Sequence, residues 1–487
     1  MQTAWHHLTR PTDRRPLWAI LAGIVLCLGG AAGVVYGAFW APFVLIAALV
    51  VSYLSLRSTR VMLATVVILV TVFPFGTLPF RAVITPALLE VAIGALLAMR
   101  VLHLLTTPNY RVDLTSFAPI VFGYIGFTLF AMFLGARGLP DMTTLHNYAK
   151  FLLGTLLMFA ILDGIQDDGD VQWALRLLLI GGAISALIGL VLYFIPAALS
   201  EQILVQFGRF GYPTSGRVLR YVEDDTSGLM RAIGLSVDPN SYGGMLAVIG
   251  AIAATQTIVA QPVLPRKWMI PISGLVVLVL FLTFSRAALG GLMIAAVYVA
   301  TVRYRRLWGW IVAAGVLATV MVVFVGIGEQ FVTRIVQGVQ FQDRANQMRL
   351  AEFNNAIAVI QAYPFFGIGF GTAPDIDLVA GVSNIYLAIA QRLGLVGLLI
   401  FVGMMGSLFV RSWRSLALAV AQNDEVHASW LIGLQAGIVA ALAVGMLDHY
   451  FFNIEFSHMT ALLWCTIGLQ LAVARNIKPL STGTESV

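Results

Sequence analysis

Residues 273–300 read SGLVVLVLFLTFSRAALGGLMIAAVYVA, and this stretch decides the class of fold. Two apolar runs, 268–284 and 287–302, enclose one charged residue, Arg286. A helix of about 20 apolar residues crosses the ~30 Å hydrocarbon core of a bilayer. The stretch therefore predicts two membrane-spanning helices joined by a very short turn, with Arg286 where one span ends and the next begins.

The same pattern recurs along almost the whole chain. Its 487 residues are 59% hydrophobic and 11% charged, with a mean hydropathy of +0.90, whereas soluble domains carry about 25% charged residues. The composition excludes a soluble protein and predicts an all-α polytopic integral membrane protein with about 14 (roughly 12–14) transmembrane helices. The predicted spans are 17–36, 38–56, 61–78, 85–103, 117–135, 149–162, 172–196, 243–260, 268–284, 287–302, 307–326, 394–411, 429–447 and 458–474.

Charge sets the predicted orientation. The net charge of +6 has to be read by side of the membrane, because cytoplasmic loops are enriched in Lys and Arg. With the amino terminus inside, the short loops carry 17 basic residues on the cytoplasmic side and four on the outer side. This predicts a bacterial inner-membrane protein with both termini in the cytoplasm. A cleaved secretory signal is the alternative for the first run, but the second run begins almost at once, which favours an uncleaved span.

Two long segments interrupt the spans, and both fall on the periplasmic face. Loops of this length are usually functional when they are not disordered. In the second, Leu350, Phe353, Ile357 and Ile360 recur at helical spacing while Glu352 points elsewhere, which predicts an amphipathic helix at the outer interface. The predicted organisation is N-terminal transmembrane helices 1–196, first periplasmic loop 197–242, central transmembrane helices 243–326, large periplasmic loop 327–393, C-terminal transmembrane helices 394–475 and cytoplasmic tail 476–487.

Arginines on the outer face are the first candidates for a site. A guanidinium binds phosphate bidentately and keeps its charge, and a charge at the edge of the membrane is costly unless it is paired. Arg231, Arg286 and Arg349 are therefore predicted to bind a phosphate group. A structural or snorkelling arginine is the alternative at each position.

Two further pieces carry polar chemistry. Asp238–Pro239 has the residue types of a helix start, whose N–H groups can assist anion binding, although a plain helix cap is the alternative. Asp448 precedes His449 at the outer end of a span, and a carboxylate beside an imidazole raises its basicity. These two residues are the predicted catalytic pair, with a structural role as the alternative.

No metal site, nucleotide site or cofactor is predicted. Cys27 and Cys465 lie inside apolar runs, so they offer neither a disulfide nor a thiolate metal site. The acidic groups at 223–225 and 375–377 lie in polar loops, where carboxylates are usually solvated. Residues 363–371, YPFFGIGFG, resemble a phosphate loop only superficially because they follow a helix rather than a strand, and their glycines are predicted to allow a tight turn.

The order of these pieces resembles the O-antigen ligase and Wzy-type polymerase superfamily of bacterial surface-glycan enzymes. The resemblance covers about 245 residues, from Arg231 to Arg475. Its pieces are Arg231 with Asp-Pro-Asn at 238–240, TFSRAALG at 283–290, YPFFGIGFG at 363–371, SNIYL at 383–387 and QRLGLVGLLIF at 391–401.

The resemblance implies a GT-C-like fold and transfer of a glycan, at the periplasmic face, from a polyprenyl diphosphate carrier to an acceptor hydroxyl without a metal. The implied partners are this lipid-linked oligosaccharide donor, a glycan acceptor, the bilayer and other polysaccharide-assembly proteins, and no nucleic acid. Arg231, Arg286 and Arg349 match the family's arginines. The candidates for the acceptor or loop part of the site are Asp238, Asn240, Ser383, Asn384 and Tyr386.

The chain departs from the lipid A-core ligases at Ser383–Asn384, where those enzymes commonly carry His-Asn. Serine cannot replace the histidine as a base, so His449 or Asp448 serves, or departure of the diphosphate drives the reaction with little base assistance. This difference from the lipid A-core ligases favours a polymerase of undecaprenyl-diphosphate-linked repeat units of an exopolysaccharide or O-antigen. An O-antigen ligase or a protein O-oligosaccharyltransferase is the near alternative, and a lipid-linked glycan flippase or transporter is the distant one.

Overall fold

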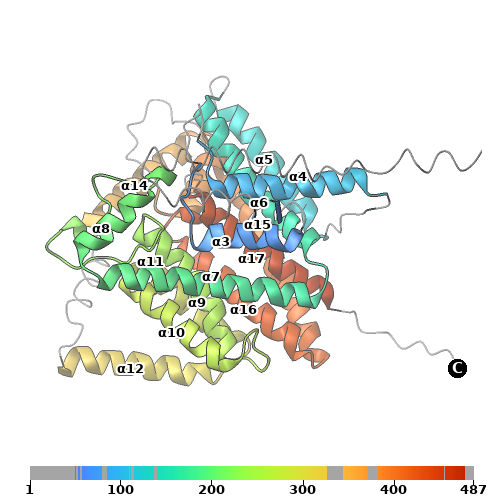
Figure 1. The fold of residues 1–487 in the computed structure, drawn as a ribbon. Helices are drawn as coiled ribbons and strands as arrows, with labels where there is room; N and C mark the ends of the chain where they lie inside the picture. Colours follow the sequence, from blue (N-terminus) through green and yellow to red (C-terminus); the bar gives the residue numbers. More distant parts are fainter. Residues whose placement is uncertain are drawn as a thin grey trace, which may run out of the picture. The chain divides into compact units, whose positions relative to one another are not determined.

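The computed structural model describes residues 50, 53–54, 58–78, 85–108, 110, 115–135, 140–325, 344–370, 382–453 and 456–477. The chain divides into two compact units, Met1–Thr65 and Val66–Val487. Most of the described residues belong to the second unit, and α3 (Thr59–Thr71) begins in the first. The elements in the described ranges are helices and turns, with two isolated β-bridges in place of a sheet (Figure 1).

Seven helices in the described part of the chain are long and apolar enough to cross a membrane. They are α4 (Leu88–Thr106), α6 (Met142–Gly164), α7 (Asp168–Phe194), α9 (Pro239–Ile258), α15 (Ile385–Ala421), α16 (Glu425–Val444) and α17 (Ser457–Asn476). Further apolar helices are α5 (Ala118–Gly135), α10 (Arg266–Leu282), α11 (Arg286–Val302) and α12 (Leu307–Val325). Each predicted span from 61–78 onward coincides with one of these helices or with α3. The first two predicted spans, 17–36 and 38–56, lie wholly or largely outside the described residues. The all-helical, multi-span character is confirmed, and the total of about 14 spans stays a prediction.

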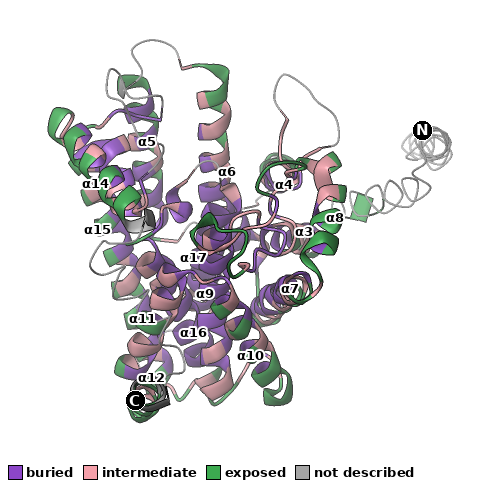
Figure 2. Cartoon of the chain, turned by 90° about the vertical axis from the view of Figure 1, so that its left-hand side faces the viewer, coloured by how far each residue is buried: buried purple, intermediate pink, exposed green. Residues whose placement is uncertain are grey.

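Three helices form the core of the second unit. The apolar windows of α9, α16 and α17 are 83%, 78% and 89% buried, against 28% for α4 (Figure 2). Small residues let these helices approach closely, as is usual between membrane helices. A Cβ added at Gly437 of α16 would lie 2.9 Å from Ile252 of α9, and one at Gly291 of α11 would lie 2.9 Å from the carbonyl oxygen of Ala440. Helices α9, α11 and α16 are thereby held together, and their ends carry much of the candidate site.

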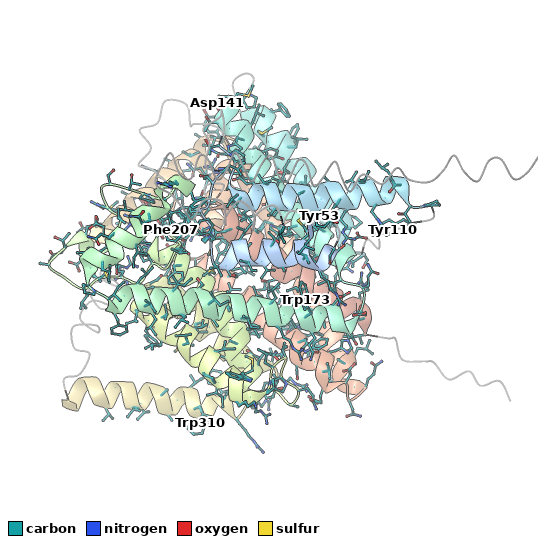
Figure 3. The ribbon with its side chains drawn as sticks, in the orientation of Figure 1. Tyr53, Tyr110, Asp141, Trp173, Phe207 and Trp310 are labelled. Carbon is teal, nitrogen blue, oxygen red and sulfur yellow. The ribbon has the colours of Figure 1, made fainter. Side chains whose placement is uncertain are left out.

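Large apolar side chains cover the outside of the peripheral helices. Phe194 of α7 is 71% exposed, and Trp310 of α12, labelled in Figure 3, is 75% exposed. Soluble monomers rarely expose large continuous apolar patches. Surfaces of this kind suit contact with lipid acyl chains, in agreement with the hydropathy of the sequence.

The first predicted periplasmic loop is folded. It contains α8 (Ala197–Gln206) and two short 3-10 turns, η1 (Phe207–Phe210) and η2 (Val222–Asp224). Its own hydrophobic cluster includes Leu204, Tyr212, Val218, Ile233 and Leu235. The last part of this loop, from Arg231 to the start of α9, is therefore anchored by this cluster, which includes Ile233 and Leu235.

The second predicted loop contains α14 (Arg344–Ala362) and the beginning of α15. The amphipathic helix predicted there is confirmed as a helix. Helix α15 begins at Ile385, nine residues before the predicted span 394–411, because Asn384 caps it, and its backbone breaks at Gly394. The helical piece from Ile385 to this break falls within the predicted large periplasmic loop, 327–393, and precedes the predicted span.

Candidate functional site

Arg231 lies in the loop before α9 and is held by two elements. Its Nε donates to the carbonyl oxygen of Thr283 at 2.7 Å, and its Nη2 donates to Oδ1 of Asn240 at 2.6 Å. The neighbouring N–H of Ala232 donates to the carbonyl oxygen of Leu282 at 2.8 Å. The guanidinium is thus fixed between the start of α9 and the turn that joins α10 to α11.

Asp238 caps α9. A plain helix cap was the alternative that the sequence analysis gave for this residue. Its Oδ1 accepts the N–H groups of Asn240 at 2.9 Å and Ser241 at 2.8 Å, and Pro239 occupies the first helical position. The first N–H groups of α9 are therefore used by Asp238 itself. Anion binding at this place depends on the arginine rather than on the helix start.

Asp448 forms an ion pair with Arg349, which approaches from α14. Nη2 of Arg349 lies 3.4 Å from Oδ1 of Asp448, and the two side chains are 15% and 3% exposed. Oδ2 of Asp448 is buried and accepts no hydrogen bond from the described residues. A buried carboxylate oxygen without a donor is costly, so this atom is a candidate for chemistry or for a ligand.

The two arginines and two carboxylates influence one another. Burial raises the pKa of the Asp448 carboxyl to about 7, although Arg349 and Arg231 act to lower it. Burial lowers the pKa of Arg231, whereas Asp238 and Asp448 raise it, and the guanidinium stays charged. The start of α9 packs against the segment that carries Asp448, since a Cβ added at Gly244 would lie 3.6 Å from Val444 and 3.8 Å from Phe451. Four residues that the sequence singled out, Arg231, Asp238, Arg349 and Asp448, thus form one cluster. They come from the loop and cap before α9, from α14 and from the segment after α16.

His449 is oriented differently from its neighbour Asp448. Its ring stacks on Tyr450, with 4.8 Å between the ring centroids and 27° between the planes. Oδ1 of Asp448 contacts Arg349. The action of Asp448 and His449 as a catalytic pair stays a prediction.

The start of α15 docks onto the end of α16. Oδ1 of Asn384 accepts the N–H of Tyr386 at 2.8 Å, and Nδ2 of Asn384 donates to the carbonyl oxygen of Met446 at 2.8 Å. The N–H of Ser383 donates to Oε2 of Glu352 at 2.9 Å, and Glu352 itself is buried on α14. The backbone of Ser383 and the side chain of Asn384 thus join α14 and α15 to the segment just before Asp448, and the hydroxyl of Tyr386 donates to the carbonyl oxygen of Leu442 at 3.1 Å.

Arg286 is the first residue of α11. The cap is Ser285, whose Oγ accepts the N–H of Ala288 at 3.4 Å, and the preceding Thr283 supplies the carbonyl that holds Arg231. A Cβ added at Gly243 would lie 3.0 Å from Ser285, so this turn packs against α9. The backbone of Arg286 therefore lies beside the cluster, three residues from an acceptor of Arg231.

Two residues next to the site have strained backbones. Val237 has φ 61° and immediately precedes Asp238, and Phe284 has φ 52° and stands two residues before Arg286. Left-handed conformations are rare for branched and bulky residues, cost of order 1–3 kcal/mol and concentrate at functional sites. Packing around α9 and the α10–α11 turn must hold these conformations in place.

The glycine-rich segment, of which residues 363–370 are described, packs against α15. The N–H groups of Ile368 and Gly369 donate to the carbonyl oxygens of Gln391 at 3.0 Å and Arg392 at 2.8 Å. A Cβ added at Gly367 would lie 2.5 Å from the Arg392 carbonyl carbon. The predicted tight turn is present. It lets this segment contact α15 closely, just before the break at Gly394.

Helix α14 places its charged face toward the protein. Arg349 and Glu352 reach the site, while Leu350 and Ile357 are each 44% exposed. Outward apolar residues are what a helix at a membrane interface requires. The location of α14 at such an interface stays a prediction.

Acidic residues elsewhere have ordinary partners. Asp224 pairs with Arg217 at 2.6 Å on the surface, and Asp225 accepts the N–H of Ser227 at 2.9 Å. The acidic pair at 375–377 lies outside the described residues. Among the described residues, no group of three His, Cys, Asp or Glu side chains is placed to hold a metal ion.

Sequence reasoning missed Tyr450 and underestimated Glu352. Tyr450 lies in the 3-10 turn η3 (Tyr450–Phe452), is 7% exposed, and has the pKa of its hydroxyl raised by burial and by the nearby carboxylates of Asp238 and Asp448. Because Tyr450 precedes Phe451 and Phe452, it looks in the sequence like part of an apolar wall, and no pattern there indicates a polar surrounding. Glu352 stands three residues after Arg349, on the same helix face, and that spacing was the available signal.

The fold and the charged cluster define a polytopic membrane protein with an arginine–carboxylate site at the ends of its helices. Residues 271–402 match the O-antigen ligase family. This match confirms the resemblance to the O-antigen ligase and Wzy-type polymerase superfamily and supports a membrane enzyme of that type. The matched segment includes Arg286, Arg349 and Ser383–Asn384 and ends before Asp448. No curated protein matches the chain.

Proposed function

We propose that this protein polymerises glycan repeat units carried on undecaprenyl diphosphate, at the periplasmic face of the bacterial inner membrane. The observation that carries the proposal is the Arg349–Asp448 pair with Arg231 nearby, assembled beside the turn of Arg286. Fixed guanidinium groups suit a diphosphate, and a buried carboxylate with one unbonded oxygen suits proton transfer.

In this proposal the arginines hold the donor. The bond between the anomeric carbon and the phosphate oxygen breaks, and its electron pair passes to the departing diphosphate. Arg231, Arg286 and Arg349 stabilise the charge that develops there, because preorganised donors in a partly desolvated site act most strongly on such charge. The lipid chain lets the donor reach the site laterally from the bilayer.

Asp448 is the proposed base for the acceptor. The acceptor hydroxyl oxygen forms the new bond to the anomeric carbon, and its proton passes to Oδ2 of Asp448, the oxygen that Arg349 does not contact. A pKa near 7 suits a group that has to accept a proton at neutral pH. His449 is the second candidate for this role.

Ser383 favours a polymerase over a lipid A-core ligase, since the histidine common to those ligases is replaced by a residue that is not a base. Deletion of the gene separates the two. A polymerase predicts single repeat units left on the lipid carrier, whereas an O-antigen ligase or a protein O-oligosaccharyltransferase predicts full-length polymer left on the carrier. Persistence of normal polymer attached to its final acceptor would overturn all three.

A flippase or transporter is the candidate from another class. Such proteins place charges near the bilayer midplane and use broken spans. Helix α15 is broken at Gly394, but the charged cluster comes from the loop before α9, from α14 and from the segment after α16, outside the seven candidate spans of the described residues. Product formation by purified protein without an ion gradient supports the enzyme, while gradient-dependent movement of lipid-linked glycan without a new glycosidic bond supports the transporter.

A further inference from the structure

A second group of charged side chains lies where α4 and α6 pack together (Figure 1). Nε2 of His146 lies 3.2 Å from Oε2 of Glu90, and Nζ of Lys150 lies 3.4 Å from Oε1 of the same carboxylate. Glu90 belongs to the first turn of α4, and the other two residues stand one turn apart on α6. The predicted orientation places these ends of both helices on the periplasmic face, the face predicted for the Arg349–Asp448 pair.

Glu90 is held by the start of its own helix. Its Oε2 also accepts the N–H of Ala87 at 3.1 Å, as the glutamate of a capping box does. The Glu90 side chain is 8% exposed, against 20% for His146 and 19% for Lys150. The carboxylate therefore lies inside, and the imidazole and the ammonium group form an accessible rim around it.

The rim keeps hydrogen-bonding capacity after both contacts with Glu90 are made. Nε2 of His146 donates to the carboxylate, so the neutral ring carries no hydrogen on Nδ1, and this atom is an acceptor. Lys150 has three N–H groups, and its ion-pair partner among the described residues is Glu90. The group thus offers one acceptor and further donors side by side, which is more than the joining of two helices requires.

The balance of charge indicates what kind of ligand fits. The negative charge of Glu90 offsets the positive charge of Lys150, so the group attracts an anion less strongly than the arginines of the first cluster do. A hydroxyl group both donates and accepts. Of two neighbouring hydroxyls on a sugar ring, one can donate to Nδ1 of His146 while the other accepts from Nζ of Lys150. Mixed donors and acceptors without excess charge therefore favour a carbohydrate over a phosphate.

Helix α6 connects this group with the segment that carries Asp448. The ring centroid of Phe151 lies 5.5 Å from that of Phe452 in η3, four residues after Asp448. Phe151 stands five residues after His146, about 7.5 Å along the helix. A glycan that begins at Asp448 and runs along α6 toward the start of that helix would pass His146.

We propose that Glu90, His146 and Lys150 form a subsite for two neighbouring hydroxyl groups of the acceptor glycan. This inference rests on the proposed function. His146 and Lys150 contact the sugar, and Glu90 holds both of them in position without contacting it. No bond forms or breaks at this place. The subsite is therefore expected to act on binding of the acceptor and to leave the affinity for the donor diphosphate unchanged.

The test uses the full-length purified protein and two probes. The first probe is the repeat-unit oligosaccharide released from the lipid-linked repeat units of a strain that lacks the gene. The second is undecaprenyl diphosphate without sugar. The affinity for each probe and the melting temperature are measured for every variant. The oligosaccharide reports on the subsite, and undecaprenyl diphosphate reports on the arginine cluster.

Lys150→Met keeps the apolar stem of the side chain and removes the ammonium group. We expect this variant to bind the oligosaccharide about tenfold more weakly, the scale of a lost hydrogen bond from a charged group, with unchanged affinity for undecaprenyl diphosphate. Lys267→Met is the matched control, since Lys267 is exposed in the first turn of α10, which is predicted to be cytoplasmic. The control should bind both probes like the wild type.

His146→Gln separates the contact with the sugar from the contact between the helices. The glutamine amide can still donate to Glu90, whereas the acceptor Nδ1 is lost. We expect binding of the oligosaccharide to weaken about fivefold, the scale of one neutral hydrogen bond, with the melting temperature of the wild type. His103→Gln, at an exposed position in the last turn of α4, is the matched control and should change neither affinity.

Two variants that bind the oligosaccharide as tightly as the wild type would overturn the subsite and leave the proposed function intact. A wild type that binds undecaprenyl diphosphate but not the oligosaccharide would have the same consequence. If both variants lose both probes equally and melt at a lower temperature, the group only holds α4 against α6, and the subsite is again overturned. A wild type that binds neither probe would overturn the subsite and the proposed function together.

Discussion

Arg231 and Arg349 contact different kinds of acceptor. Arg231 gives two N–H groups to fixed acceptors, whereas Arg349 contacts a carboxylate at 3.4 Å, which is longer than a strong charge-assisted bond. Arg349 also lies beside Oδ1 of Asp448, the proposed base, so its substitution is expected to affect both donor binding and the proton transfer.

Arg286 supplies the sharpest prediction at this scale. Arg286→Ala should reduce glycan transfer about a hundredfold, since loss of one preorganised donor costs ~3 kcal/mol of transition-state stabilisation. Arg286→Lys should keep only a small part of the activity because lysine retains the charge and loses the fork. Transfer is measured per unit of correctly inserted protein.

Arg217→Ala is the control, since Arg217 forms an exposed pair with Asp224 and surface pairs contribute little. Normal activity per inserted molecule in Arg286→Ala would remove Arg286 from the site. Lower yield with unchanged specific activity would mark it as a structural residue.

Asp448 gives a pH dependence with a definite sign. Burial raises the pKa of its carboxyl to about 7, and a base works only when it is deprotonated. Transfer should therefore rise with pH through about 7 and fall about tenfold for each pH unit below that value. Asp448→Asn should lose activity at every pH. A rate that stays level from about pH 5.5 to 8 would contradict the role of Asp448 as base.

At the scale of elements, the break in α15 is set by a glycine. Gly394 has φ 69° and ψ −178°, a conformation that is essentially restricted to glycine, and a Cβ there would lie 2.2 Å from the carbonyl oxygen of Phe365. Gly394→Ala should destabilise the protein by about 1–3 kcal/mol. It should also lower activity by moving the start of α15.

Gly403→Ala is the matched control in the same helix, since nothing lies within 4 Å of its added Cβ. Thermal unfolding of the two purified variants measures the difference. Equal melting temperatures would show that the contact between the glycine-rich segment and α15 does not hold the outer part of the fold.

Helices were easier to predict than the contacts between them. Apolar runs fixed the positions of the spans because burial in lipid acts on composition over about 20 residues. The start of α15 at Ile385 was missed, since Asn384 caps it through local hydrogen bonds and the piece up to Gly394 is less apolar than a span. The residue types of Asp238–Pro239, in contrast, predicted the start of α9 correctly.

At the scale of the whole molecule, the site joins residues that are far apart in the chain. Arg349 and Asp448 are 99 positions apart, and no local pattern links them. The sequence could predict Arg231, Arg349, Asp238 and Asp448 as polar residues on one side of the membrane, but the pairing of Asp448 with Arg349 depends on the packing of α14. The match at 271–402 reaches only part of this set.

The central claim is that this outer-face cluster transfers a lipid-linked glycan. The most direct measurement uses purified protein in liposomes, supplied with lipid-linked repeat units extracted from a strain that lacks the gene. The account predicts that the wild type joins the units without an ion gradient, and that Asp448→Asn, inserted equally well, forms almost no product. Absence of product with the wild type, or equal product with Asp448→Asn, would contradict it.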